Sequence, residues 1–283
     1  MKEREFKLKK SEFDALRQIV YDRTGITLKE SKYEMVYSRL ARRIRSLELD
    51  SFGDYLAYLK SAEGSVEMAD FVNAMTTNLT RFFREGHHFQ HMRQEVLLAK
   101  VEGARRNLFD RTFRVWSAGC SSGMEPYSIA MTVKASLPSK ENWKTQILAT
   151  DIDTNMLSTG MAGRYRKKEA ESIPEGLAKK YVRYSDDQAI MADELKEMIS
   201  FKKLNLMEEW PIKKPFDVIF CRNVMIYFDT PTQKKLIDKF VNLLTPNGTL
   251  YVGHAEALVA SHPRLVSVGK SSFIMKDQMK VSV

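Results

Sequence analysis

The sequence predicts an α/β protein with a doubly wound, mainly parallel sheet, an all-α domain before it and a small inserted β-subdomain. The first observation is that residues 11–75 place apolar side chains at helical spacing. The second is that the chain from residue 87 alternates short apolar runs with helical segments, which is typical of a parallel sheet with helices on both faces. The third is that residues 163–204, rich in Lys and Glu, interrupt this alternation. We therefore expect a helical domain at 1–75, a connector at 76–86 and a sheet domain at 87–283.

Three hydroxyl residues in the helical part stand three positions before a carboxylate, as in a capping box: Ser11, Ser31 and Ser51. After the second of them, four apolar residues recur at a period of 3.6 and predict one buried helix face: Val36, Leu40, Ile44 and Leu47. Four arginines occupy the rest of this helix: Arg39, Arg42, Arg43 and Arg45. In an arbitrary protein, such a run is more often a solvated face than a binding surface.

The connector at 76–86 is polar, contains aromatic residues and shows no apolar periodicity. Beyond it, the expected strands cover residues 114–117, 146–150, 217–221 and 249–253. The expected helices cover residues 125–135, 153–161 and 231–244. A hairpin near residues 265–268 and 272–275 is expected to follow.

Composition excludes some classes of protein. The N-terminus lacks the apolar core of a signal peptide, and no run approaches the roughly 18 apolar residues of a membrane span. With two cysteines, Cys120 and Cys221, a disulfide framework is not expected, and we expect a cytoplasmic protein that does not insert into the membrane. The net charge of +9 leaves nucleic acid, a membrane surface or an acidic protein as possible partners.

Two neighbouring features point to a nucleoside cofactor. The turn Gly119–Gly123 follows a predicted strand and opens a predicted helix, so that a ligand could approach bare backbone N–H groups. Its spacing departs from the dinucleotide fingerprint, which weakens the case for NAD. Asp151 ends the next strand, where a carboxylate can accept hydrogen bonds from ribose hydroxyls.

Four segments together resemble the CheR-type chemotaxis-receptor methyltransferases, which use S-adenosylmethionine to esterify glutamates. They are Asn78-Leu-Thr-Arg-Phe-Phe-Arg-Glu85, Phe113-Arg-Val-Trp-Ser-Ala-Gly-Cys-Ser-Ser-Gly-Met-Glu-Pro-Tyr-Ser128, Ala149-Thr-Asp-Ile-Asp153 and Phe216-Asp-Val-Ile-Phe-Cys-Arg-Asn-Val-Met-Ile-Tyr-Phe-Asp229. The resemblance covers most of the chain. It implies a class I methyltransferase-like fold for the sheet domain.

The resemblance also implies the site residues. Those implied for the cofactor are Asn78, Thr80, Arg84, Gly119, Glu125, Asp151, Asn205, Leu206, Arg222 and Asn223. Among these, Glu125 is expected near the methionine amino group, Asp151 at the ribose and Asn205–Leu206 beside the adenine. Met124 departs from the family, which usually has a second carboxylate there.

A glutamate side chain, with a reference pKa of about 4.3, is already an anion at pH 7, so this reaction needs no general base. Alignment and exclusion of water should supply most of the rate. We expect Arg84 and Tyr227 to act by orienting the reacting groups. No Cys, His and carboxylate cluster has zinc spacing, and His87 and His88 are expected in surface or capping roles, so we predict no metal.

The resemblance makes the cytoplasmic helical domain of chemotaxis receptors the expected partner, with Arg39, Arg42, Arg43 and Arg45 facing it. A monomer is expected. Some members of the family bind a peptide at the receptor's C-terminus with a glycine-rich loop in the inserted subdomain. The matching stretch here, residues 183–190, contains no glycine, so we expect no binding of such a pentapeptide.

Two other functions compete with this interpretation. A nucleic-acid methyltransferase would suit the basic charge, but residues 222–224 lack the proline of an Asn/Asp-Pro-Pro-aromatic turn and the chain has no Pro-Cys dipeptide. We therefore expect no nucleic-acid partner. The other competitor is a non-catalytic module that binds S-adenosylmethionine, which Met124 favours and the four residues Arg84, Asp151, Asn223 and Tyr227 disfavour.

Overall fold

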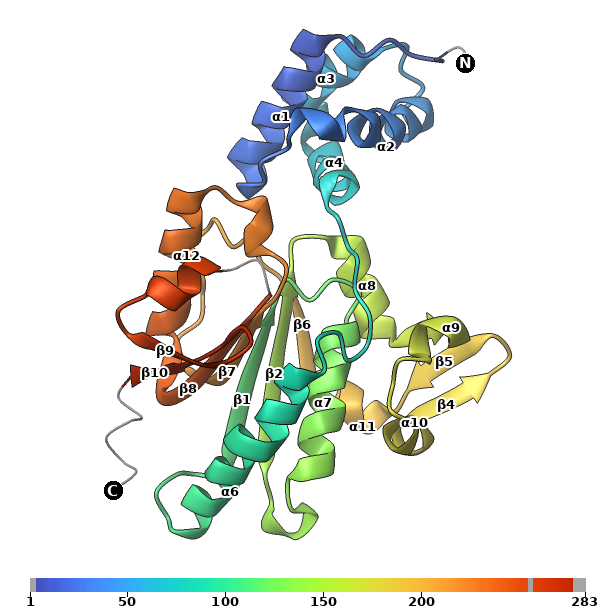
Figure 1. Cartoon of the computed structure of the whole chain (residues 1–283). Coiled ribbons are helices and arrows are strands. Elements are labelled where there is room, and N and C mark those ends of the chain that lie inside the picture. Colours follow the sequence, from blue (N-terminus) through green and yellow to red (C-terminus); the bar gives the residue numbers. More distant parts are fainter. Residues whose placement is uncertain (1–3, 254–256, 277–283) are drawn as a thin grey trace.

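The computed structural model describes residues 4–253 and 257–276, and it contains a helical domain above a sheet domain (Figure 1). The helices of the first domain are α1 (Lys10–Thr24), α2 (Tyr33–Ser46), α3 (Phe52–Lys60) and α4 (Glu67–Met75), with short 3-10 turns η1 (Glu30–Lys32) and η2 (Glu63–Ser65). Val36, Leu40 and Ile44 of α2 are fully buried, as their spacing predicts.

One of the three predicted helix caps is confirmed. Ser51 accepts a hydrogen bond from the Asp54 backbone N–H (3.1 Å) at the start of α3. Ser11 lies inside α1, which begins earlier because Glu12 accepts a hydrogen bond from the Lys9 N–H (2.7 Å). Ser31 falls in η1, and neither serine caps a helix.

The main sheet has seven strands in the order β6-β2-β1-β7-β8-β10-β9. In chain order they are β1 (Thr112–Ala118), β2 (Lys144–Asp151), β6 (Ile199–Lys203), β7 (Phe216–Cys221), β8 (Leu244–Val252), β9 (Leu265–Gly269) and β10 (Ser272–Met275). The first five strands across the sheet are parallel, and β10 is antiparallel to both of its neighbours. The predicted mainly parallel sheet and its terminal hairpin are confirmed.

Helices cover both faces of this sheet (Figure 1). They are α5 (His87–His91), a π-helical turn η3 (Met92–Leu97), α6 (Leu98–Arg105), α7 (Met124–Ser136), α8 (Thr154–Ala162) and α12 (Thr230–Asn242), with short turns η4 (Ser139–Glu141), η5 (Met225–Tyr227) and η6 (Ala257–Ser261). Because strand side chains alternate, Val115 packs in the core that includes Met92 and Tyr127, whereas its neighbour Trp116 packs in the core beneath Phe240 of α12.

The inserted subdomain is a three-stranded antiparallel sheet in the order β3-β5-β4. Its elements are β3 (Arg164–Arg166), α9 (Lys167–Ala170), α10 (Glu175–Tyr181), β4 (Val182–Ser185), β5 (Gln188–Met191) and α11 (Asp193–Lys196). Its expected end at residue 204 is wrong, because Ile199–Lys203 forms β6 and pairs in parallel with β2. β6 lies at the edge of the sheet and is only partly buried. Its polar residues therefore did not predict a strand.

The helical domain meets the sheet domain on two sides. On one side, the Thr27 N–H donates to the Tyr227 carbonyl (2.8 Å) and the Tyr21 hydroxyl donates to Asp229 Oδ2 (2.9 Å). On the other, the Asn73 amide donates to the Thr154 hydroxyl at the start of α8 (2.9 Å). Residues that are far apart in the sequence therefore hold the two domains together on both sides of the space between them.

None of the helices within residues 4–253 and 257–276 is long and apolar enough to cross a membrane.

Candidate active site

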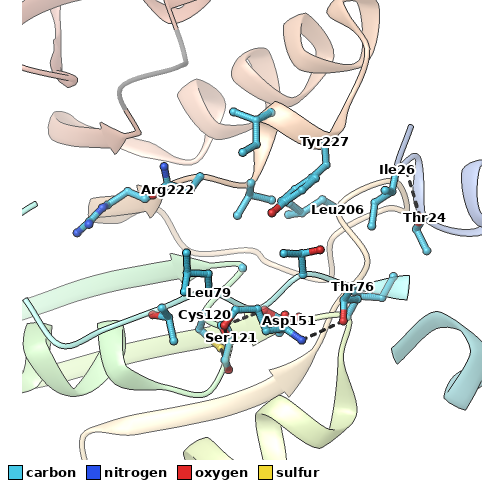
Figure 2. A pocket seen from close by; sticks show the side chains of 18 of the residues that line it. Thr24, Ile26, Thr76, Leu79, Cys120, Ser121, Asp151, Leu206, Arg222 and Tyr227 are labelled. Atoms are coloured by element: carbon cyan, nitrogen blue, oxygen red, sulfur yellow. Dashed lines mark hydrogen bonds between the residues drawn. The ribbon is translucent and has the colours of Figure 1, made fainter. Parts of the chain in front are cut away.

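A cavity of about 460 Å³ lies between the two domains, at the carboxyl ends of β1, β2 and β7. The linker from Thr76 to Arg81 closes one side, and residues 24–29 of the helical domain close another. Every residue predicted for the cofactor, together with Tyr227, lines this cavity: Asn78, Thr80, Arg84, Gly119, Glu125, Asp151, Asn205, Leu206, Arg222 and Asn223. Figure 2 shows Tyr227 on the opposite side of the cavity from Asp151.

The turn between β1 and α7 requires two glycines. Gly119 has φ of +79°, and a Cβ atom there would lie 2.4 Å from Val224 Cγ2. Gly123 has φ of +87°, and a Cβ atom there would lie 2.7 Å from the Gly160 Cα atom. Both a left-handed backbone and a side-chain-free surface are needed at these positions. Gly119 lines the cavity, but the N–H groups of Gly119, Cys120 and Ser121 donate within the protein, so the predicted bare N–H groups are not seen at these positions.

Asp151 ends β2 with its carboxylate at the cavity wall. Oδ2 accepts a hydrogen bond from the Ser121 N–H (2.7 Å), and Oδ1 accepts one from the Asp153 N–H (2.9 Å). Burial raises the pKa of Asp151, while these backbone donors oppose the rise. Each carboxylate oxygen has a second lone pair, so the group can still accept hydrogen bonds from a diol.

A group of charges lies at the other end of the cavity. Arg222 is buried, and its Nε lies 3.6 Å from Glu85 Oε2 and 3.6 Å from Glu125 Oε2. Glu125 also accepts a hydrogen bond from the Ser117 hydroxyl (2.7 Å). Burial raises the pKa of Glu125, and the Arg222 charge opposes this rise.

Several buried polar atoms here have no hydrogen-bond partner within the described residues. They are Nε and Nη1 of Arg222 and Oδ1 of Asn223. Asn223 adopts a positive φ of 56°, which places it at a sharp turn directly after β7. Buried donors and acceptors without partners are costly, so these atoms are candidates to pair with water or with a polar ligand.

Arg84 and Tyr227 are brought to the same cavity from distant parts of the chain. The Arg84 guanidinium donates to the Leu79 carbonyl (2.8 Å) and so also braces the linker. Burial raises the pKa of Tyr227, and the Arg84 charge opposes the rise. The Tyr227 hydroxyl is therefore protonated at neutral pH, and it also has a hydrogen bond with the Thr77 side chain.

Two predicted cofactor residues use their amide groups inside the protein. Asn78 Nδ2 donates to Asp153 Oδ2 (2.7 Å), and Asn205 Nδ2 donates to the Arg23 carbonyl of the helical domain (2.8 Å). Both side chains thus hold segments together at the wall of the cavity. Their contact with the cofactor stays a prediction.

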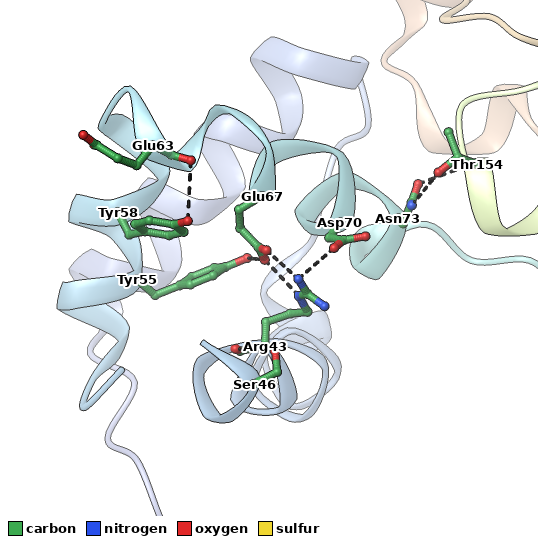
Figure 3. A network of polar contacts seen from close by, with 9 residues as sticks. All are labelled: Arg43, Ser46, Tyr55, Tyr58, Glu63, Glu67, Asp70, Asn73 and Thr154. Atoms are coloured by element: carbon green, nitrogen blue, oxygen red, sulfur yellow. Dashed lines mark hydrogen bonds and ion pairs between the residues drawn. The ribbon is translucent and has the colours of Figure 1, made fainter. Parts of the chain in front are cut away.

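The predicted arginine cluster does not form one surface. Arg43 donates to Glu67 Oε1 (2.9 Å) and to Asp70 Oδ2 (2.8 Å), and the Tyr55 hydroxyl donates to the same Glu67 carboxylate (2.8 Å) (Figure 3). The Glu67 side chain is only 3% exposed, so it needs this cation. Two carboxylates of the helical domain engage the Arg43 guanidinium, so this side chain has a structural role there. Its contact with a receptor stays a prediction.

The other three arginines differ from one another. Arg39 donates to the backbone carbonyls of Ala74 (3.0 Å) and Thr76, and burial lowers its pKa. Arg45 lies 3.0 Å from Glu5 on the surface, and Arg42 is exposed. An amphipathic helix pattern separates buried from unburied faces but does not show where long polar side chains reach.

The helical domain contributes to the cavity wall, which its sequence pattern does not predict. Thr24, Ile26, Thr27, Leu28 and Met35 line it, although none carries a recognisable motif. Their place depends on how the two domains dock. Only a three-dimensional arrangement could have revealed them.

The expected surface or capping role of His88 is wrong, because this side chain is fully buried against the Tyr251 ring, with centroids 5.0 Å apart. Glu85, His87 and His88 place one potential ligand atom each within 4.8 Å of the others. Nε2 of both histidines lies 3.1 Å from the Lys270 carbonyl oxygen. Our prediction that the protein uses no metal stays a prediction.

Comparison with known proteins agrees with this geometry. Residues 78–274 match the family model described as CheR methyltransferase, SAM binding domain, and residues 11–76 match CheR methyltransferase, all-alpha domain. A "Chemotaxis protein methyltransferase 2" of Pseudomonas aeruginosa is 42% identical over 95% of this chain and 94% of its own length. The "Chemotaxis protein methyltransferase" of Escherichia coli is 44% identical over 88% of this chain and 85% of its own. A "Probable chemotaxis protein methyltransferase" of Rhizobium etli is 42% identical over 84% and 89%.

Proposed function

Since the chain belongs to the CheR methyltransferase family, we propose that it transfers a methyl group from S-adenosylmethionine to glutamate side chains of chemotaxis receptors, forming methyl esters. The observation that carries this proposal is the chemistry of the cavity wall. Among the described residues that line it there is no histidine, and its two carboxylates, Glu125 and Asp151, are both engaged by the protein. Such a site suits a nucleophile that is already an anion.

The residues present fit the cofactor. Asp151 would accept hydrogen bonds from its ribose hydroxyls, while the orphaned atoms of Arg222 and Asn223 would pair with its charged amino-acid end. When bound, the cofactor supplies an electrophilic methyl group on a sulfonium. The bare turn at Gly119 leaves backbone close to that ligand.

The chain's own residues orient the incoming glutamate. Arg84 offers a cation and Tyr227 a protonated hydroxyl in the same cavity, and both can donate hydrogen bonds to a carboxylate. A glutamate carboxylate is ionised at neutral pH, so no proton has to be removed from it. Proximity and the closed walls provided by the linker and the helical domain would then favour the transfer.

The receptor would approach the open side of the cavity. Lys29, Lys32 and Arg81 are exposed residues that line it, and Arg42 is exposed on α2. These cations complement a helical receptor surface that carries acidic methylation sites. We propose this surface in place of the four-arginine cluster.

A labelling experiment tests the function. Tritiated S-adenosylmethionine is incubated with the protein and receptor signalling domains, and the isolated receptor is then treated with base. We expect label on the receptor that base releases as methanol, because methyl esters hydrolyse in base. Label that is stable to base, or that appears on nucleic acid instead, would contradict glutamate esterification.

Replacing Arg42 with alanine should reduce receptor methylation by a few-fold at low salt. The difference should shrink as salt rises, because exposed charges are screened within about 10 Å at 0.1 M ionic strength. Initial rates at several salt concentrations measure this. Arg106→Ala, an equal charge change at the exposed end of α6, is the control and should match the wild type. Equal rates for Arg42→Ala and Arg106→Ala at every salt concentration would remove Arg42 from the receptor surface.

A receptor C-terminal pentapeptide should not bind, in contrast to some family members. β4 and β5 are joined by the two-residue turn Asp186–Asp187, with Ser185 paired to Gln188. Such a tight hairpin leaves no loop to fold over a peptide, and its two carboxylates repel a peptide's terminal carboxylate. Calorimetry with the pentapeptide should show no heat of binding. Micromolar affinity, or competition with methylation, would overturn this prediction.

A further inference from the structure

The linker between the domains is held from two sides at Thr76. From the helical domain, the Arg39 guanidinium on α2 donates to the Thr76 carbonyl and to the Ala74 carbonyl (3.0 Å). From the sheet domain, Asp153 Oδ2 accepts the Thr76 hydroxyl at 2.6 Å. Thr76 is 7% exposed and Asp153 2%, so these contacts are shielded from water. Figure 2 shows Thr76 at the edge of the cavity that contains Asp151.

Asp153 continues this chain of contacts in two directions. Its Oδ1 accepts the N–H groups of Asn155 (3.0 Å) and Met156 (3.2 Å), and so caps α8. Its own N–H donates to Asp151 Oδ1 (2.9 Å). Asp153 therefore joins three parts of the site: its carboxylate binds the linker and the start of α8, and its backbone N–H binds the residue predicted to contact the ribose.

A second path connects the same two segments. The Asn78 side-chain amide donates to Asp153 Oδ2 (2.7 Å), and the Asn78 backbone carbonyl accepts a hydrogen bond from the Ser121 hydroxyl (3.2 Å). The Ser121 N–H donates to Asp151 Oδ2 (2.7 Å). Both oxygens of Asp151 are thus held by N–H groups from residues that contact the linker. A shift of the linker would change the direction of the lone pairs that Asp151 offers to a ligand.

We propose that Arg39 and Thr76 are positioning residues that hold Asp151 for cofactor binding through Asp153. This assigns Arg39 of α2 to the cofactor site rather than to the receptor. Its guanidinium is occupied by two backbone carbonyls, whereas Arg42 on the same helix is exposed. The inference uses the cofactor of the family and does not depend on which side chain receives the methyl group.

The test measures binding of S-adenosylhomocysteine by calorimetry without any receptor. Arg39→Ala and Thr76→Val should each raise Kd about three- to tenfold, because each loses one or two buried hydrogen bonds that hold the site. The double variant should be less than additive, since both act on one path. Thr76→Ser keeps the hydroxyl, and Arg42→Ala removes a neighbouring charge, so both should stay within about twofold of the wild type.

Thermal unfolding identifies the variants that are folded at the temperature of the titration. Thr76→Val preserves the shape of the side chain, so it decides the question even where Arg39→Ala unfolds. Wild-type affinity in folded Arg39→Ala and Thr76→Val would overturn the proposal, as would full additivity in the double variant. Because no receptor is present, this result is separate from the base-labile methylation assay, and either proposal can fail alone.

Discussion

Replacing Asp151 with asparagine should weaken binding of S-adenosylmethionine by about 1–3 kcal/mol, which is roughly five- to 150-fold. The carboxylate is held by the N–H groups of Ser121 and Asp153, and an amide NH₂ in its place would face one of these donors. The variant also loses the negative charge that strengthens hydrogen bonds from the ribose hydroxyls. Calorimetry on the purified protein measures this effect.

Asp187→Asn is the matched control, because Asp187 is exposed in the β4–β5 turn and loses the same charge. It should bind the cofactor as the wild type does. Unchanged affinity in a folded Asp151→Asn variant would remove this residue from the cofactor site.

As the pH is lowered, the affinity of the wild type for the cofactor should begin to fall at a higher pH than the usual pKa of an exposed aspartate would give. The reason is that burial raises the pKa of Asp151 and the neutral acid is the poorer acceptor.

Replacing Arg43 with alanine should lower the free energy of unfolding of the helical domain by about 3 kcal/mol. The change leaves the Glu67 carboxylate, 3% exposed, without its cation, and unpaired buried charges cost roughly 3–5 kcal/mol. The low end applies because the Arg43 side chain is 28% exposed and partly solvated. Urea unfolding followed by helical circular dichroism measures the loss.

Two further variants separate charge from packing. Arg42→Ala removes an exposed arginine from the same helix and should change stability by less than about 0.5 kcal/mol. The double variant Arg43→Met, Glu67→Met should recover much of the loss, because it leaves no buried charge unpaired. Stability equal to the wild type in Arg43→Ala would mean that the contacts in Figure 3 contribute little.

Local patterns in the sequence predicted most of the sheet domain. Alternating residues such as Val115 and Trp116 enter opposite cores because strand side chains have a period of two. Gly119 and Gly123 predicted the turn because few other residues tolerate its backbone. The strand β6 was missed because an edge strand is partly solvated and carries no continuous apolar run.

The destination of long polar side chains could not be predicted in the same way. The spacing of Arg39, Arg42 and Arg43 placed them all on the unburied part of one helix. In the structure, Arg39 binds carbonyls at the start of the linker, Arg43 binds Glu67, and Arg42 is exposed. These differences depend on partners 24 to 37 residues away in the chain. The 3.6-residue period of a helix contains no information about such distant partners.

The sequence by itself determined the family, the parallel sheet and the residues that meet at its carboxyl edge, because short-range periodicity and the motifs of the turns carry that information. Only the tertiary structure decided which groups close the cavity and which hold the linker. Ile26 of the helical domain and Thr76 of the linker acquire their roles from docking of two domains, and docking depends on long-range contacts that no single segment specifies.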